Sequence, residues 1–261
     1  MSANTDPSNL AASSANATDV NITQAQPNKP WSASATLGLS FLLFILYCLL
    51  SALMLGAVSL FETANPPSSD ALMMDGDCLA INYLLTALAL SPFIFYFAGK
   101  RKLTTASAYL GFDKLPSKKM FINFTLVLFA YFALTYVASE FFAIEMPQSM
   151  VDIYQSTDYL ILLFIVVVIA APVFEEVVFR GFMFKGLKHS RLGVIGSIII
   201  TSILFTLLHG GQYELSVLVM LFSLAVILGI ARQRSGGIYL PIYLHLVNNL
   251  VSSIDLYLTL G

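Results

Sequence analysis

Charged side chains are scarce in this chain of 261 residues. Asp, Glu, Lys and Arg make up only 11% of it, whereas hydrophobic residues make up 57%. Soluble domains average about 25% charged residues. Together with a mean hydropathy of +0.80, the scarcity of charge excludes an ordinary soluble domain and predicts a polytopic membrane protein.

Several other signals are missing as well. Cys48 and Cys78 are the only cysteines, and without a pairing pattern they predict neither a disulfide framework nor a thiolate metal site. A net charge of −2 gives no indication of a nucleic-acid partner. There is no internal repeat of the transporter kind. The serine-protease pattern Gly-x-Ser-x-Gly is also absent, since the nearest match, at residues 38–42, ends in Leu.

The first 32 positions are rich in Ser, Ala, Asn, Thr and Gln. Because such a segment cannot bury a core, residues 1–32 are predicted to form a disordered polar tail. We expect the rest to divide into an N-terminal three-helix membrane region, residues 33–150, and a second membrane region, residues 151–261.

Apolar segments of membrane-spanning length dominate the rest of the chain. A spanning helix needs about 20 largely apolar residues. The sequence therefore predicts an all-α transmembrane bundle of about seven helices, with short loops and with the fifth and sixth helices adjacent and antiparallel. Pro92, Pro172 and Pro241 are expected to kink or begin helical segments. The candidate spans are Ala35–Leu60, Cys78–Ala98, Met120–Ile144, Tyr159–Gly181, Leu192–Leu208, Leu215–Ala231 and Ile238–Leu258.

Positive charge falls on one side of this arrangement. All 13 Lys and Arg residues lie before the first span, between spans two and three, at the end of span four and the loop after it, or between spans six and seven. The positive-inside rule then places the N-terminus in the cytoplasm and the C-terminus outside. We expect an integral protein of a bacterial inner (plasma) membrane. The opposite loops carry acidic residues and no basic ones: Glu62, Asp70, Asp75, Asp77, Glu145, Asp152, Asp158 and Glu214.

An ionisable cluster interrupts the fourth apolar segment, at Glu175-Glu176-Val-Val-Phe-Arg180. Such groups at membrane depth are costly and mark a functional site by default. In a helix, Glu176 and Arg180 share a face and are predicted to pair. Glu175 lies on a neighbouring face without a local partner. The alternative is that all three residues form a structural ion-pair knot between helices.

Two of the three histidines also lie at membrane depth. His209 ends an apolar run and follows Phe205 by four residues, whereas His245 lies inside the last span and precedes Asn249 by four. His189 lies in a basic loop and is expected to be solvated. A lone membrane histidine is more often a helix-packing hydrogen bonder than a catalyst, so the functional interpretation rests on the joint pattern on three helices.

Three motifs in this order resemble the CAAX-protease and bacteriocin-processing (CPBP, Abi) family of intramembrane proteases, type II CAAX prenyl endopeptidase-like. The resemblance covers roughly Asp158 to Ser253. It implies an intramembrane endopeptidase of glutamic type, often classed as a metalloprotease, and makes residues 151–261 the catalytic membrane region. The motifs are Glu175-Glu176-x-x-x-Arg180, Phe205-x-x-x-His209 and His245-x-x-x-Asn249.

The resemblance also implies a role for each site residue. Glu175 is the expected general base that activates a water, and His209 orients the same water. His245 and Asn249 are expected to stabilise the oxyanion. The expected supporting residues are Glu176, Arg180 and Phe205. The implied substrate is a membrane-associated, prenylated or other peptide, with membrane lipid as the other partner, no cofactor, and an open oligomeric state.

Three alternatives stay open from the sequence. Glu175, His209 and His245 make a His₂Glu set of the kind that binds zinc, although no His-Glu-x-x-His motif is present. The chain could instead be a catalytically silent membrane scaffold or regulator of the same fold. A channel or transporter would use buried Glu and His as a proton relay.

Overall fold

The computed structural model describes residue 1 and residues 29–61, 68–101 and 105–261. Every regular element within those residues is a helix, which confirms the all-α prediction. Nearly all of the predicted polar tail, together with Glu62 and Lys102, lies outside the described residues.

Each of the seven predicted spans is helical. Among the described residues, five helices are long and apolar enough to cross a membrane, the first of them α1 (Ala33–Phe61). α10 is an apolar helix of 16 residues, and α12 has 22 residues, with His245, Asn248, Asn249, Ser252 and Ser253 in its central turns. The other four candidates are α3 (Gly76–Gly99), α5 (Lys118–Phe142), the continuous helix Leu160–Lys188 and α11 (Leu215–Ser235). The two helices outside this set are α10 (Gly193–Leu208) and α12 (Tyr239–Leu260).

The continuous helix Leu160–Lys188 changes its hydrogen-bonding pattern along its length. It comprises α7 (Leu160–Ile165), the π-helical η1 (Val166–Ala170), α8 (Ala171–Glu176), the π-helical η2 (Val177–Met183) and α9 (Phe184–Lys188). Proline has no N–H and clashes with the preceding turn, and α8 begins next to Pro172, as the sequence predicts. π-Helical turns inside α-helices are frequent at functional sites. Short helices lie in the connections: α2 (Ser69–Met74), α4 (Ala106–Leu110) and α6 (Gln148–Gln155).

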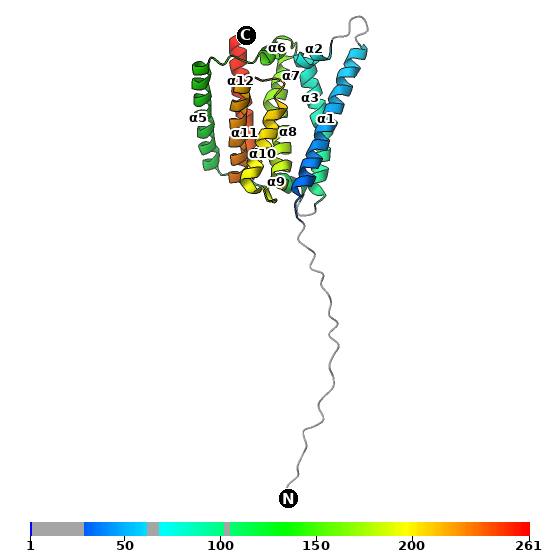
Figure 1. The fold of residues 1–261 in the computed structure, drawn as a ribbon, viewed down its shortest axis with the longest axis vertical. Coiled ribbons are helices and arrows are strands. Elements are labelled where there is room, and N and C mark those ends of the chain that lie inside the picture. The colour runs from blue at the N-terminus through cyan, green and yellow to red at the C-terminus, as the bar shows by residue number, and fades with distance from the viewer. Residues whose placement is uncertain (2–28, 62–67, 102–104) are drawn as a thin grey trace.

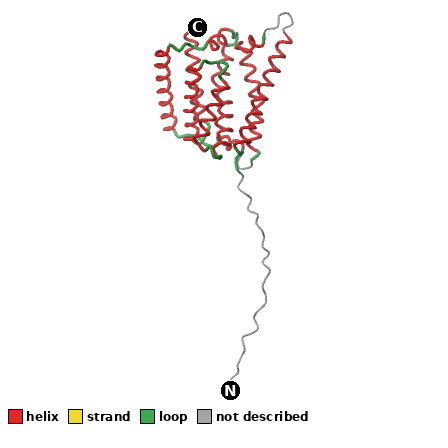
Figure 2. Tube along the Cα trace, in the orientation of Figure 1, coloured by secondary structure: helices red, strands yellow, loops and turns green. Residues whose placement is uncertain are grey.

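The helices stand side by side in one bundle, with α5 at one edge and α1 at the other (Figures 1 and 2). α10 and α11 are packed neighbours joined by a short turn, which confirms the predicted hairpin. The continuous helix Leu160–Lys188 contacts α1, α3, α10, α11 and α12. Side chains on α8 and η2 are therefore surrounded by other helices.

The N-terminal helices pack tightly against this central helix. The largest buried cluster joins Leu90 and Ile94 of α3 to Phe182 and Met183 of η2. Gly186 of α9 lies so close to α1 that a Cβ in its place would overlap the side chain of Thr36. Because lipid tails are as apolar as these side chains, the cluster stabilises the bundle through close van der Waals packing. This cluster fixes α3 relative to the helix that carries the ionisable residues.

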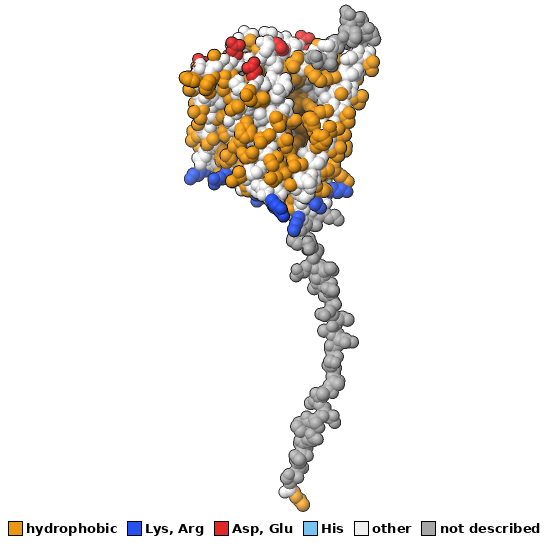
Figure 3. All heavy atoms as spheres, in the orientation of Figure 1, with side chains coloured by type: hydrophobic (Ala, Val, Ile, Leu, Met, Phe, Trp, Pro, Cys, Tyr) orange, Lys and Arg blue, Asp and Glu red, His pale blue; other side chains and the backbone are white. Residues whose placement is uncertain are grey.

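Charge separates along the axis of the bundle. Lys and Arg side chains gather at the end where α1 begins, Asp and Glu gather at the opposite end, and an apolar band lies between them (Figure 3). By the positive-inside rule, we propose that the basic end is cytoplasmic.

This orientation predicts the result of reporter fusions. A fusion after Lys102 should report the cytoplasm, and a fusion after Gly261 should report the opposite compartment, because an odd number of spans separates the two ends. A fusion after Glu145, in an acidic loop, is the control and should agree with the one after Gly261. If the fusions after Lys102 and Gly261 report the same side, the count of seven spans is wrong.

Candidate active site

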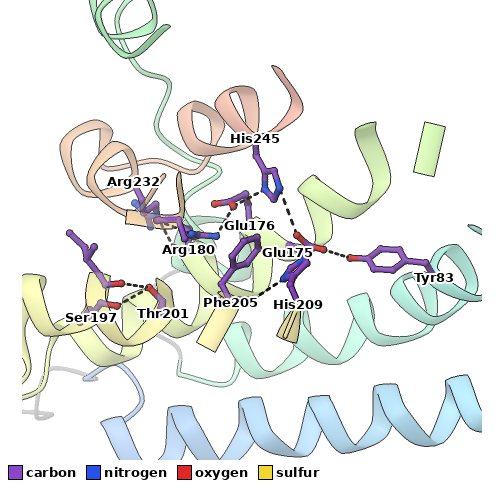
Figure 4. A network of polar contacts seen from close by, with 12 residues as sticks. Tyr83, Glu175, Glu176, Arg180, Ser197, Thr201, Phe205, His209, Arg232 and His245 are labelled. Carbon is purple, nitrogen blue, oxygen red and sulfur yellow. Dashed lines mark hydrogen bonds and ion pairs between the residues drawn. The ribbon is translucent and has the colours of Figure 1, made fainter. Parts of the chain in front are cut away.

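Glu175 lies in the last turn of α8, where three helices meet. Its side chain is 19% exposed. One carboxylate oxygen, Oε1, accepts a hydrogen bond of 3.1 Å from the hydroxyl of Tyr83 on α3. The other, Oε2, lies 3.8 Å from Nε2 of His245 on α12 (Figure 4). Glu175 has no ion-pair partner one turn away, as predicted, and its two contacts come from other helices.

Glu176 and Arg180 form the predicted pair, and both side chains are fully buried. Nη1 of Arg180 donates to Oε1 of Glu176 at 2.7 Å. Nη2 of Arg180 donates to the backbone carbonyl oxygen of Ala225 on α11 at 2.9 Å. Arg232, also on α11, donates from Nε to the backbone carbonyl oxygen of Arg180 at 2.8 Å. Because buried charges are tolerated only with such partners, this network ties α8 and η2 to α11.

The ring of His245 lies between the two glutamates. Its Nδ1 is 3.0 Å from Oε1 of Glu176. A carboxylate oxygen accepts hydrogen bonds, so Nδ1 is assigned the proton and Nε2 faces Glu175. The distance of 3.8 Å between Nε2 of His245 and Oε2 of Glu175 exceeds that of a direct hydrogen bond. One water molecule could bond to both atoms.

His209 directly follows the last residue of α10 and is half-buried. Its Nδ1 lies 2.9 Å from the backbone carbonyl oxygen of Phe205. A carbonyl oxygen only accepts, so Nδ1 carries a proton, and Nε2 of the neutral ring is left as a base. The ring of Phe205 lies 5.0 Å from that of His209 and 5.7 Å from that of His245. Phe205 therefore packs against both histidines.

Tyr213 lies beside His209, in the loop between α10 and α11. Its ring stacks on His209 with centroids 5.9 Å apart and planes 9° apart. Burial raises the pKa of Tyr213, and the negative charge of Glu175 raises it further. The hydroxyl of Tyr213 therefore keeps its proton at neutral pH.

Asn249 makes a contact separate from this cluster. Its Nδ2 donates to the backbone carbonyl oxygen of Val167 in η1 at 2.8 Å, and its Oδ1 accepts from Nδ2 of Asn248 at 3.1 Å. The contact joins α12 to a π-helical segment. The oxyanion role of Asn249 stays a prediction; one N–H of Nδ2 is engaged by Val167, and the second N–H would have to reach the substrate oxygen.

The donor set predicted for zinc is not assembled. Among the described residues, no group of three or more His, Cys, Asp or Glu side chains is placed to hold a metal ion. The hydrogen bonds of His209 Nδ1 to Phe205 and of Glu175 Oε1 to Tyr83 leave Nε2 of His209 and Oε2 of Glu175 as the atoms that could face an ion. These side chains do not fit a metal ion as they are arranged, so no step of the proposed reaction passes through one.

Two contact residues escape prediction from the sequence. Tyr83 lies far from the motifs in the chain, and nothing in the sequence distinguishes it among the 12 tyrosines. The sequence places Arg232 in the connection between spans six and seven, whereas it is only 5% exposed and lies in the last turn of α11. In the sequence, the burial of Arg232 is indicated only by its position directly after the apolar residues Ile230 and Ala231.

Comparisons with known proteins agree with the motifs. Residues 157–251 match the family model "Type II CAAX prenyl endopeptidase Rce1-like". The match confirms, for this segment, the family resemblance that the motifs indicated. The chain is also 37% identical over 87 residues to an "Uncharacterized 24.3 kDa protein" of Escherichia coli. That alignment covers 33% of this chain and 40% of the relative's length. No solved structure matches.

Proposed function

We propose that the protein is an intramembrane endopeptidase that uses Glu175 as its general base. The observation that carries the proposal is the placement of the Glu175 carboxylate, with Oε1 held by Tyr83 and Oε2 facing His245 across 3.8 Å. A positioned carboxylate within hydrogen-bond reach of a water is a competent general base. The match of residues 157–251 to a family of endopeptidases supports the same conclusion.

The reaction begins with a water molecule between Glu175 and His245. Oε2 of Glu175 removes one proton, and the resulting hydroxide attacks the carbonyl carbon of the scissile peptide bond. The tetrahedral intermediate collapses when the protonated Glu175 returns that proton to the leaving amine. General acid–base catalysis of this kind contributes about 10²–10⁴-fold in rate.

The histidines and Asn249 complete the proposed machinery. Nε2 of His209 accepts a hydrogen bond from the attacking water and orients it. His245 and Asn249 stabilise the negative charge that develops on the substrate oxygen. Donation from Nε2 of His245 requires a second proton on its ring, on the side that faces Oε2 of Glu175.

The proposed substrate is a peptide held at the membrane. Glu175 lies near the middle of the continuous helix Leu160–Lys188, which is long and apolar enough to cross a membrane, so a substrate must reach it from the lipid phase or along the bundle. The family name points to a prenylated C-terminal peptide, and a peptide without a prenyl group is the comparison substrate.

Purified protein in liposomes should cleave a membrane-anchored peptide, with the cut identified from product masses. The affinities of the protein for matched peptides with and without a farnesyl group should show whether the farnesyl chain determines substrate binding.

The glutamic mechanism predicts that treatment with a chelator before the assay leaves kcat unchanged within about twofold, because no metal ion holds the attacking water. Loss of activity on chelation, with recovery on adding zinc, would overturn that mechanism, and no cleavage of any peptide would favour the silent scaffold.

A further inference from the structure

Tyr83 is the residue through which the N-terminal region reaches the proposed base. It lies on α3, 92 positions before Glu175, and outside the family-like segment 157–251. Its hydroxyl donates to Oε1 of Glu175 at 3.1 Å (Figure 4). A hydrogen bond to a charged acceptor is roughly twice as strong as one between neutral groups.

The Tyr83 ring is held by aromatic contacts on two helices. Tyr47 of α1 meets it edge to face, with centroids 6.3 Å apart. Phe174 of α8 meets it at 6.2 Å and 88°. Phe174 directly precedes Glu175, so the helix that carries the base also positions the ring of its donor. Edge-to-face pairs at these distances have the preferred aromatic geometry.

Other polar groups lie near Glu175, but their contacts differ from that of Tyr83. The Glu175 charge interacts with Tyr47, Tyr213 and Arg180 through space. His245 faces Oε2 at 3.8 Å. Only the hydroxyl of Tyr83 makes a hydrogen bond with the Glu175 carboxylate among the described contacts.

We infer that Tyr83 is a positioning residue for Glu175, and that α1 and α3 thereby complete the active site carried by the family-like segment. The inference rests on the proposed function. The terminal torsion of a Glu side chain is broad and has no sharply preferred angle. Fixing Oε1 leaves Oε2 pointing at Nε2 of His245, which is the direction that the attacking water requires.

The test compares Tyr83→Phe with Tyr131→Phe. Each substitution keeps the ring and removes one interhelical hydroxyl bond of 3.1 Å, to Glu175 in one case and to the backbone carbonyl oxygen of Met220 in the other. Tyr83→Phe should lower kcat about tenfold and change KM by less than about twofold, because a hydrogen bond to a charged group is lost from the reacting state. Tyr131→Phe should leave both constants unchanged.

The pH profile separates positioning from simple packing. A donor to a carboxylate favours the charged form, so the acidic limb of the kcat/KM profile should move to higher pH in Tyr83→Phe and stay in place in Tyr131→Phe. The infrared carboxyl band of Glu175, identified by its absence in Glu175→Gln, should titrate with the same shift. This second readout does not need a substrate.

The outcomes distinguish this inference from the proposed function. If wild-type protein cleaves its substrate and Tyr83→Phe keeps the wild-type kcat and acidic limb, the positioning role is wrong while the protease assignment stands. If no peptide is cleaved, the protease assignment fails, and an unshifted infrared titration in Tyr83→Phe would then overturn the positioning role separately. If kcat and the melting temperature of Tyr83→Phe both fall while the acidic limb stays in place, Tyr83 acts only as a packing residue.

Discussion

Glu175→Gln should abolish peptide cleavage while the protein stays folded. Gln is nearly isosteric with Glu, and its amide oxygen can still accept the hydrogen bond from Tyr83, which donates at 3.1 Å to the native carboxylate. The amide cannot take a proton from water at neutral pH, so the first step of the reaction is lost. Removal of a general base costs about 10²–10⁴-fold in rate, which should take turnover to the detection limit.

The measurement is single-turnover cleavage, together with substrate binding and a thermal melt of the same preparation. Binding and melting temperature should match those of wild type within error. Glu214→Gln is a matched control, since Glu214 is an exposed carboxylate at the start of α11, near the site in the chain but on the acidic rim. Cleavage by Glu175→Gln at the wild-type rate would end the assignment of Glu175 as the base, whatever the family resemblance implies.

His245→Ala should show whether Glu175 acts alone or as part of a unit. His245 contacts both glutamates, through Nδ1 to Glu176 at 3.0 Å and through Nε2 to Glu175 at 3.8 Å. Residues that act together in one step lose activity in a strongly non-additive way. Adding His245→Ala to Glu175→Gln should therefore cost little more than Glu175→Gln alone.

The contacts that the sequence predicted are those that one helix determines by itself. Glu176 and Arg180 are four residues apart, and that spacing sufficed to predict their bond of 2.7 Å. The same holds for the hydrophobic lengths of the spans and for the helix boundary at Pro172. In these cases the geometry of a single helix determines the contact, the length or the boundary, because the residues involved are close together in the chain.

The contacts that escaped prediction depend on how two helices are set against each other. The bond from Tyr83 to Glu175 requires a particular rotation and depth of α3 against α8, and hydropathy does not report either quantity. The π-helical turns η1 and η2 change which side chains share a face along Leu160–Lys188, so ideal helical spacing misplaces neighbours there. Asn249 illustrates the effect, since its partner is a carbonyl oxygen of η1.

Arg180→Ala should have the largest effect on stability of any single substitution at the site. The Arg180 side chain is fully buried and donates to Glu176 and to the backbone carbonyl oxygen of Ala225. Its removal leaves the Glu176 carboxylate buried without its cation. Breaking a buried pair in this way costs ~3–5 kcal/mol, which we expect to appear as a lower melting temperature, a lower yield and lower activity.

Arg234→Ala is the matched control for this experiment, because Arg234 is exposed at the end of α11 and its loss should leave the melting temperature unchanged. Adding Glu176→Gln to Arg180→Ala removes the orphaned charge and should restore part of the lost stability, since most of the loss comes from a buried carboxylate without a partner. The double variant should remain poorly active, because Nδ1 of His245 then loses the carboxylate that holds it at 3.0 Å. An Arg180→Ala protein with wild-type stability and only a lower kcat would contradict the structural role and place Arg180 among the residues that touch the substrate.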